Sequence, residues 1–98
     1  MEYLERALKG KEKMLGKTHP ETLKTVECIA ILYNDGLKEY GKAEELYQRA
    51  LEGYEAQLGK DNEDTKRCAR NFKICLKKSG NSAGLEALKE AHPNVESY

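Results

Sequence analysis

The sequence predicts an all-α fold: an antiparallel helix-pair, superhelical solenoid of about five helices. Three observations lead to this prediction. The chain repeats itself at an offset of 43 residues, its apolar residues recur at helical spacing, and no strand-like alternation occurs. A helical repeat of this length cannot bury its apolar face alone, so such repeats stack into an array.

The repeat relates the first quarter of the chain to its middle. At the 43-residue offset, ten of 22 aligned positions are identical without a gap. The identities pair Glu2, Arg6, Ala7, Leu8, Gly10, Glu12, Leu15, Gly16, Lys17 and Thr22 with Glu45, Arg49, Ala50, Leu51, Gly53, Glu55, Leu58, Gly59, Lys60 and Thr65. A glycine inside a helix costs about 1 kcal/mol relative to alanine. We therefore expect the next helix to approach closely at Gly10 and Gly53.

Apolar spacing and end signals predict the helices in order. The first, over 2–15, has a thin apolar stripe and stops before Gly16. The second, over 20–35, starts at a capping-box pattern, Thr18 to Glu21, with Pro20 in its first turn. Its stripe consists of Leu23, Val26, Ile29, Ala30 and Tyr33. It stops before Gly36, where a positive φ is expected.

Three further helices follow. The third, over 39–58, has the fullest stripe (Ala43, Leu46, Tyr47, Ala50, Leu51, Tyr54 and Leu58) and stops before Gly59. The fourth, over 62–78, begins in an acidic turn and stops before Gly80. The fifth, over 82–91, begins at the cap Asn81-Ser82. Beyond Pro93 we expect a frayed tail.

Composition excludes several classes of function. The 98 residues carry 17 basic and 17 acidic side chains, so no net charge draws the chain to nucleic acid or to a membrane. No apolar run approaches the ~20 residues of a membrane-spanning helix, and no signal-peptide core is visible. Three cysteines without CxxC spacing (Cys28, Cys68 and Cys75) and the lack of an Asn-x-Ser/Thr site favour reduced thiols and a cytoplasmic, intracellular location.

Residues 7–23, which read ALKGKEKMLGKTHPETL, carry a specific pattern. An apolar helix ending in IAILY follows at 29–33, and AEELYQRALE follows at 43–52. Residues 1–76 thereby resemble tetratricopeptide repeats (TPRs) of the kinesin-light-chain type, whose signature reads broadly A-L-E-x-x-E-x-x-L-G-x-x-H-P-x-T-L. The resemblance implies a TPR-like solenoid that binds proteins.

The chain departs from that pattern in places. The turn 35–42 holds one residue more than the family's period, Asn62-Glu63 replaces His-Pro, and Lys73 replaces the small residue represented by Ala30. The resemblance divides the chain into an orphan helix B (1–17), a full repeat (18–59), a degenerate repeat or cap (60–91) and a frayed tail (92–98). Either the chain is a segment of a longer protein, or a partner or another copy covers its first helix.

The resemblance further implies that the first helix of each repeat lines a concave groove. The partner-binding residues are then Lys24, Glu27, Cys28, Ile31, Asn34, Arg67, Arg70, Asn71, Ile74 and Lys77. Positions 67, 70, 74 and 77 share one helix face by spacing alone. Of the cysteines, Cys28 lies on the predicted groove, and half-buried packing is expected for it.

The fourth helix is strongly basic. From Lys66 to Lys78 it holds six bases and no acid, namely Lys66, Arg67, Arg70, Lys73, Lys77 and Lys78. They form a solvated face, or pair with Glu44, Glu45, Glu52 and Glu55 of the preceding helix, or bind an acidic ligand, which arginines hold through bidentate bonds. Nucleic acid is a third, weaker candidate, since no recognition motif is present.

No catalytic pattern is present in the sequence. His19 and His92 each precede a proline, lack metal-ligand spacing and fit a role at helix starts. No Gly-rich phosphate loop, catalytic triad order or carboxylate pair occurs. We therefore expect no enzymatic activity, no metal and no cofactor.

Three functions remain open. The first is a protein-interaction module that holds an extended, acidic peptide or a partner helix in its groove. The second is an architectural subunit or connector of a larger assembly, packed permanently through its open first helix as a homo-oligomer or against a neighbour. A third, related reading is a regulatory segment fused to an enzyme elsewhere in a longer chain.

Overall fold

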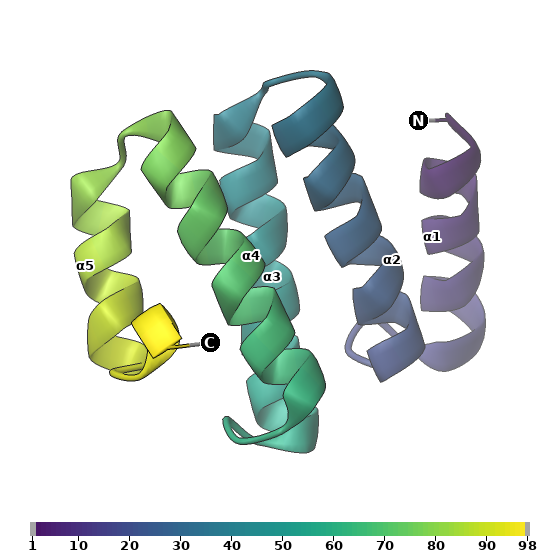
Figure 1. The fold of residues 1–98 in the computed structure, drawn as a ribbon. Coiled ribbons are helices and arrows are strands. Elements are labelled where there is room, and N and C mark those ends of the chain that lie inside the picture. The colour runs from purple at the N-terminus through teal and green to yellow at the C-terminus, as the bar shows by residue number, and fades with distance from the viewer. Residues whose placement is uncertain (1, 98) are drawn as a thin grey trace.

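The computed structural model describes residues 2–97, and these form five α-helices joined by short turns (Figure 1). The helices are α1 (Glu2–Leu15), α2 (Pro20–Ile31), α3 (Tyr40–Leu58), α4 (Glu63–Ser79) and α5 (Ser82–Ala91). A π-helical turn, η1 (Leu32–Gly36), extends α2, and a 3-10 turn, η2 (Val95–Ser97), follows α5. Within residues 2–97 there is no strand, so the predicted all-α solenoid is confirmed.

Consecutive helices pack side by side as antiparallel pairs. α2 packs against α1 and α3, and α4 packs against α3 and α5. In Figure 1, α2 and α4 lie in front of α3. This is the arrangement of stacked helix pairs, in which each helix covers the apolar stripe of its neighbours.

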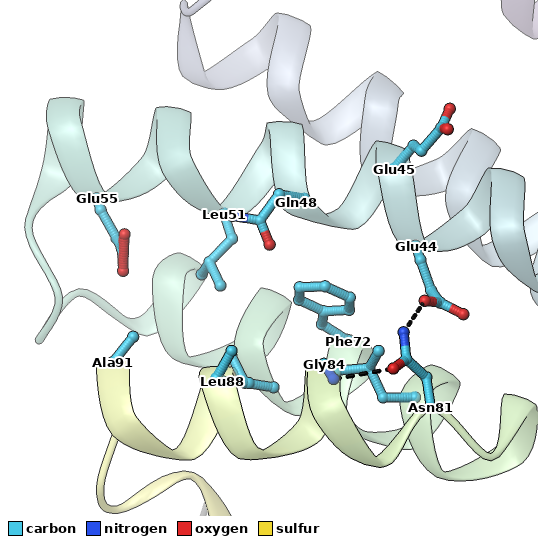
Figure 2. Close-up of a pocket in the computed structure, with 12 residues that line it drawn as sticks. Glu44, Glu45, Gln48, Leu51, Glu55, Phe72, Asn81, Gly84, Leu88 and Ala91 are labelled. Carbon is cyan, nitrogen blue, oxygen red and sulfur yellow. Dashed lines mark hydrogen bonds between the residues drawn. The ribbon is translucent and has the colours of Figure 1, made fainter.

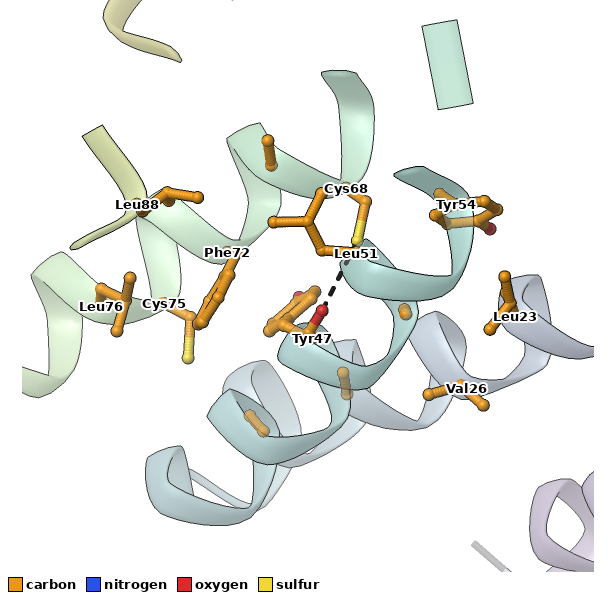
Figure 3. Packing of buried hydrophobic residues seen from close by; sticks show 14 of the residues in the cluster. Leu23, Val26, Tyr47, Leu51, Tyr54, Cys68, Phe72, Cys75, Leu76 and Leu88 are labelled. Carbon is orange, nitrogen blue, oxygen red and sulfur yellow. Dashed lines mark hydrogen bonds between the residues drawn. The ribbon is translucent and has the colours of Figure 1, made fainter. Parts of the chain in front are cut away.

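The core lies where α3 is enclosed by α2 and α4. Leu23 and Val26 of α2, Tyr47 and Tyr54 of α3, and Cys68 of α4 are all essentially inaccessible (Figure 3). The rings of Tyr47 and Phe72 lie 5.8 Å apart between centroids at 21°. Burial raises the pKa of Cys75 to about 11 and raises that of Cys68 further, so both thiols stay protonated.

The helix ends follow the sequence signals with two exceptions. At the start of α2 the cap is His19, whose Nδ1 accepts from the Glu21 amide at 3.1 Å, rather than Thr18. Gly16, Gly59 and Gly80 have the expected positive φ. Gly36 does not, and Lys38 takes the left-handed conformation instead, at φ 54°.

The π-helical turn η1 accounts for that exception. The second helix was predicted to run as an α-helix to residue 35, but the α-helical pattern ends at Ile31 and widens over Leu32–Gly36. The Leu37 amide donates to the Leu32 carbonyl at 3.0 Å, five residues back. A π turn holds one residue more than an α turn. It thus takes up the extra residue of this repeat, which displaces the left-handed position by two residues.

The repeated glycines differ in their surroundings. A Cβ on Gly53 would lie 2.7 Å from Cδ1 of the buried Leu23, so a helix does approach closely there, although it is the preceding helix α2 and not the next one. A Cβ on Gly10 would meet nothing within 4 Å, so the same prediction is wrong for α1. The difference arises because no described helix covers that side of α1.

The C-terminal residues are packed where the sequence predicted a frayed tail over 92–98. His92 and Val95 are buried, and η2 lies against α4 and α5. Lys73 donates from Nζ to the Val95 carbonyl at 3.2 Å, and Lys60 donates to the Ala91 carbonyl at 3.0 Å. Lys73, which replaces the small residue of the repeat pattern, thus provides a hydrogen-bond donor for a backbone carbonyl that follows the short helix α5.

The two glycines provide a matched pair of stability variants. Gly10→Ala should stabilise the chain by up to about 1 kcal/mol, because alanine is the better helix former. Gly53→Ala should destabilise it by about 1–2 kcal/mol, because overpacking against Leu23 exceeds that gain. Urea unfolding followed by circular dichroism measures both. Equal shifts for the two variants would contradict the close α2–α3 approach.

Candidate protein-binding groove

A groove, the α2–α4 groove, runs between α2 and α4. It encloses a hollow of about 360 Å³. Its lining consists of six of the ten predicted binding residues, namely Lys24, Glu27, Cys28, Ile31, Arg67 and Asn71. The sequence therefore identified the side chains that share this hollow, although their roles as ligand contacts stay a prediction.

The centre of the groove is a buried carboxylate, Glu27 of α2. Its side chain is only 4% exposed. Arg67 donates from Nη2 to Oε1 at 2.8 Å, Asn71 donates from Nδ2 to Oε2 at 3.0 Å, and Tyr54 donates its hydroxyl to Oε1 at 3.4 Å. A buried charge is tolerated when it is paired and hydrogen-bonded in this way. Glu27 thus joins α2 to α3 and α4.

Arg67 is committed to this internal cluster. Besides Glu27, its Nη1 donates to Asp64 Oδ1 at 2.6 Å, and its guanidinium lies 6.0 Å from the centroid of the Tyr54 ring. The hydrogen bond to Glu27 raises the pKa of Arg67 above its already high value. From the sequence, Arg67 is predicted to bind the carboxylates of an acidic ligand. In the structure its charge is already neutralised by two carboxylates.

The remaining predicted residues of α4 lie along the same helix. Arg70 is exposed and lines a neighbouring hollow of about 440 Å³ with Glu63, Lys66, Arg67 and Ser97. Within residues 2–97 it has no salt bridge, unlike Arg67 three residues earlier. Ile74 and Lys77 are exposed further along the helix.

Asn34 lies away from the groove. The π turn buries it to 4% exposure, and it lines a different hollow with Asp35, Lys38, Tyr40 and Lys78. Its Nδ2 donates to Asp35 Oδ1 at 2.9 Å, and its Oδ1 has no hydrogen-bond partner among the described residues. The assignment of Asn34 to the groove assumed an α-helical register, which η1 breaks.

The residues that form this groove lie within the match to a protein-family model. The model described as tetratricopeptide repeat matches residues 22–84, most of the 98-residue chain. The chain belongs to the tetratricopeptide repeat family. Tetratricopeptide repeats generally mediate protein–protein interaction and form a family of non-enzymatic interaction modules. A search of curated proteins gives no match.

The matched span locates the groove within the repeat. The span begins in α2, includes α3 and α4, and ends in α5. The α2–α4 groove therefore lies within the matched residues. α1 lies outside the matched residues, as does the packed C-terminal segment.

The acidic residues that pair with the basic helix α4 in the structure are not the glutamates of α3 that were predicted to pair with it. Arg67 pairs with Glu27 and Asp64, and Lys78 pairs with Asp35 at 3.5 Å. Two of the glutamates predicted to pair with it have other partners. Glu44 accepts from Asn81 at 2.6 Å, and Glu55 lies 2.6 Å from the ring of His92. His92 is the C-cap residue of α5, so its predicted helix-start role is wrong, whereas His19 caps the start of α2.

Nothing in residues 2–97 indicates a metal site or a membrane span. No cluster of three or more metal-ligating side chains occurs among them. None of the helices in the same part of the chain is long and apolar enough to cross a membrane.

Arg67 and Arg70 allow a paired test of the internal cluster. Arg67→Ala should destabilise the chain by about 2–3 kcal/mol, because it leaves the Glu27 carboxylate buried without its cation. Arg70→Ala should change stability by no more than about 0.5 kcal/mol, as for exposed sites generally. Adding Glu27→Gln to Arg67→Ala should recover part of the loss in urea unfolding. Equal losses from the two alanine variants would contradict the buried pair.

The cysteines should differ in reactivity. Cys28 is exposed, contrary to the expected half-buried packing, whereas Cys68 and Cys75 are buried with raised pKa values. One thiol should therefore react promptly with a chromogenic disulfide reagent at pH 8, and two only on unfolding. Cys28→Ser should remove the prompt phase. A prompt phase that survives this change would contradict the described burial.

Proposed function

We propose that this chain is a protein-interaction module whose α2–α4 groove binds an extended, acidic peptide. The observation that carries the proposal is the internally neutralised floor of the groove. Glu27 is the sole acid among the described residues that line it, and Arg67 already compensates this charge. Arg70, exposed on the same face of α4 and without a salt bridge among residues 2–97, then gives this side of the groove a positive charge, and the exposed Lys24, which pairs with Glu21 at 3.7 Å, lies on the α2 side.

Two exposed isoleucines would add apolar contact. Ile31 of α2 and Ile74 of α4 are 37% and 41% exposed. They are related by the 43-residue offset and occupy matching places on the first helix of each repeat. A peptide with apolar side chains between its acids would bury these residues while its carboxylates meet Arg70. The resemblance to kinesin-light-chain repeats supports a short acidic ligand by analogy alone.

The proposal assigns different roles to the neighbouring arginines. Arg67 holds α2 and α4 together through Glu27 and so sets the shape of the groove. Arg70, with an exposed guanidinium, is free to form bidentate bonds with a ligand carboxylate. A preformed groove of this kind reduces the conformational entropy lost on binding.

A displayed library of random peptides tests the proposal. The selected peptides should be enriched in Asp and Glu, and their affinity should fall as salt is raised. Arg70→Glu should weaken binding about five- to tenfold, and Ile74→Ser should weaken it to a similar extent. Fluorescence anisotropy of a labelled selected peptide measures these changes.

Lys13→Glu on α1 provides the control for charge. It makes the same change in net charge at an exposed position outside the groove, and it should leave affinity within twofold. If Arg70→Glu and Lys13→Glu weaken binding equally, the affinity depends on the net charge of the chain and not on the groove. Failure to select any peptide that competes for the groove would reject the assignment.

One observation favours the architectural alternative. α1 contains no buried residue, and its Tyr3 and Met14 are 80% and 85% exposed. These two side chains lie on one helix face, eleven residues apart. An exposed apolar face of this kind suits a permanent neighbour. A monomer of 11.1 kDa in analytical ultracentrifugation would speak against self-association through α1.

A further inference from the structure

A second hollow lies on a different face of α4, between α3 and α5. We call it the α3–α5 furrow (Figure 2). It measures about 490 Å³, more than the α2–α4 groove. The residues that line it are Glu44, Glu45, Gln48, Leu51, Glu55, Phe72, Leu76, Asn81, Gly84, Ala87, Leu88 and Ala91. None of them lines the α2–α4 groove.

The floor and one wall of the furrow are apolar. Leu51, Phe72 and Leu88 form the floor. The α5 wall consists of small residues at helical spacing, Gly84, Ala87 and Ala91. A Cβ on Gly84 would lie 2.9 Å from Leu76 Cδ2, so α5 sits tightly on α4. Small side chains on α5 leave room for another helix to approach, since helix separation depends on the residues at the contact.

The opposite wall is acidic. It consists of Glu44, Glu45 and Glu55 of α3, with Gln48 between them. Asn81 fixes Glu44 and also caps α5, since its Nδ2 donates to Glu44 at 2.6 Å and its Oδ1 accepts from the Gly84 amide at 2.9 Å (Figure 2). Glu45 is exposed. The described residues that line the furrow include no lysine and no arginine.

Another hollow, lined by α2, α3 and the turn that follows α1, differs in charge. It is lined by Lys17 and Arg49 as well as Glu52. Arg49 of α3 also forms an ion pair with Glu12, which joins α3 to α1. That hollow is therefore electrically mixed. Glu55 of the furrow contacts His92 at 2.6 Å, but no lysine or arginine lines the furrow, so a carboxylate wall beside an apolar floor distinguishes it from that hollow.

We propose that the α3–α5 furrow is a second docking site, for a basic amphipathic helix of another protein. The apolar face of that helix would cover Phe72 and Leu88, and its lysines or arginines would face the glutamates of α3. This is helix-in-groove recognition with complementary charge. The site is separate from the proposed peptide groove, so the chain would bind two partners on different faces and hold them together.

A synthetic peptide of about 18 residues provides the probe, with leucines at i, i+3, i+4 and i+7 and lysines elsewhere. Labelled with fluorescein, it should bind in an anisotropy titration, and a glutamate peptide with the same leucine pattern should not. Glu45→Lys should weaken binding about fivefold. Ala87→Arg, which places a bulky cation in the furrow, should weaken it more. Both positions are exposed, so the fold should persist, as circular dichroism can verify.

Glu86→Lys is the matched control. It makes the same charge change at an exposed position of α5 that does not line the furrow, and affinity should stay within twofold. Equal binding of a scrambled lysine–leucine peptide, equal losses from Glu45→Lys and Glu86→Lys, or no binding at all would overturn the proposal. Concentration-dependent dimers that Ala87→Arg disperses would show instead that a second copy of this chain fills the furrow. Arg70→Glu should leave binding of this probe unchanged, which separates the furrow from the groove.

Discussion

The buried carboxylate of Glu27 is the interaction on which the relative placement of the two repeats depends. It receives hydrogen bonds from one side chain of α3 and two of α4, across up to 44 residues of sequence. Apolar packing alone would allow neighbouring helices to slide, because it is not directional. A buried charge accepts few geometries, since each loss of a donor leaves the carboxylate poorly solvated. Glu27 thereby fixes α2 and α4 at one separation, and the groove between them has a defined shape.

The helix positions were predictable from the sequence because they depend on local signals. Caps, glycines and apolar spacing placed the ends of α3 and α4 within one residue of their observed positions. Six of the ten residues predicted for the groove line it, because the resemblance to tetratricopeptide repeats implies which face of α2 and of α4 lines such a groove. What Arg67 does there was not predictable from spacing, since its acid partner lies 40 residues away. Tyr54 belonged to an apolar stripe, and nothing local marked it as a donor to Glu27.

Where prediction failed, tertiary packing decided the outcome. Gly10 and Gly53 occupy the same repeat position, but a described helix approaches only the latter. A turn signal near residue 36 was correct, and yet the chain used a π turn that moved the left-handed residue to Lys38 and buried Asn34. The C-terminal residues contain few apolar side chains, but Val95 and His92 find partners on α3 and α4. A periodic pattern specifies which residues face inward without specifying what they will meet.

The ion pair of Glu12 with Arg49 and the contact of Glu55 with His92 are related by the same 43-residue offset as the helices that carry them. The first contact joins α1 to α3, and the second joins α3 to the residue that follows α5. Glu27 and Arg67 join α2 to α4 on the other side of α3. The solenoid therefore has ties on both sides of its central helix. Moving neighbouring helices apart on either side of α3 would therefore break at least one contact of a glutamate with arginine or histidine.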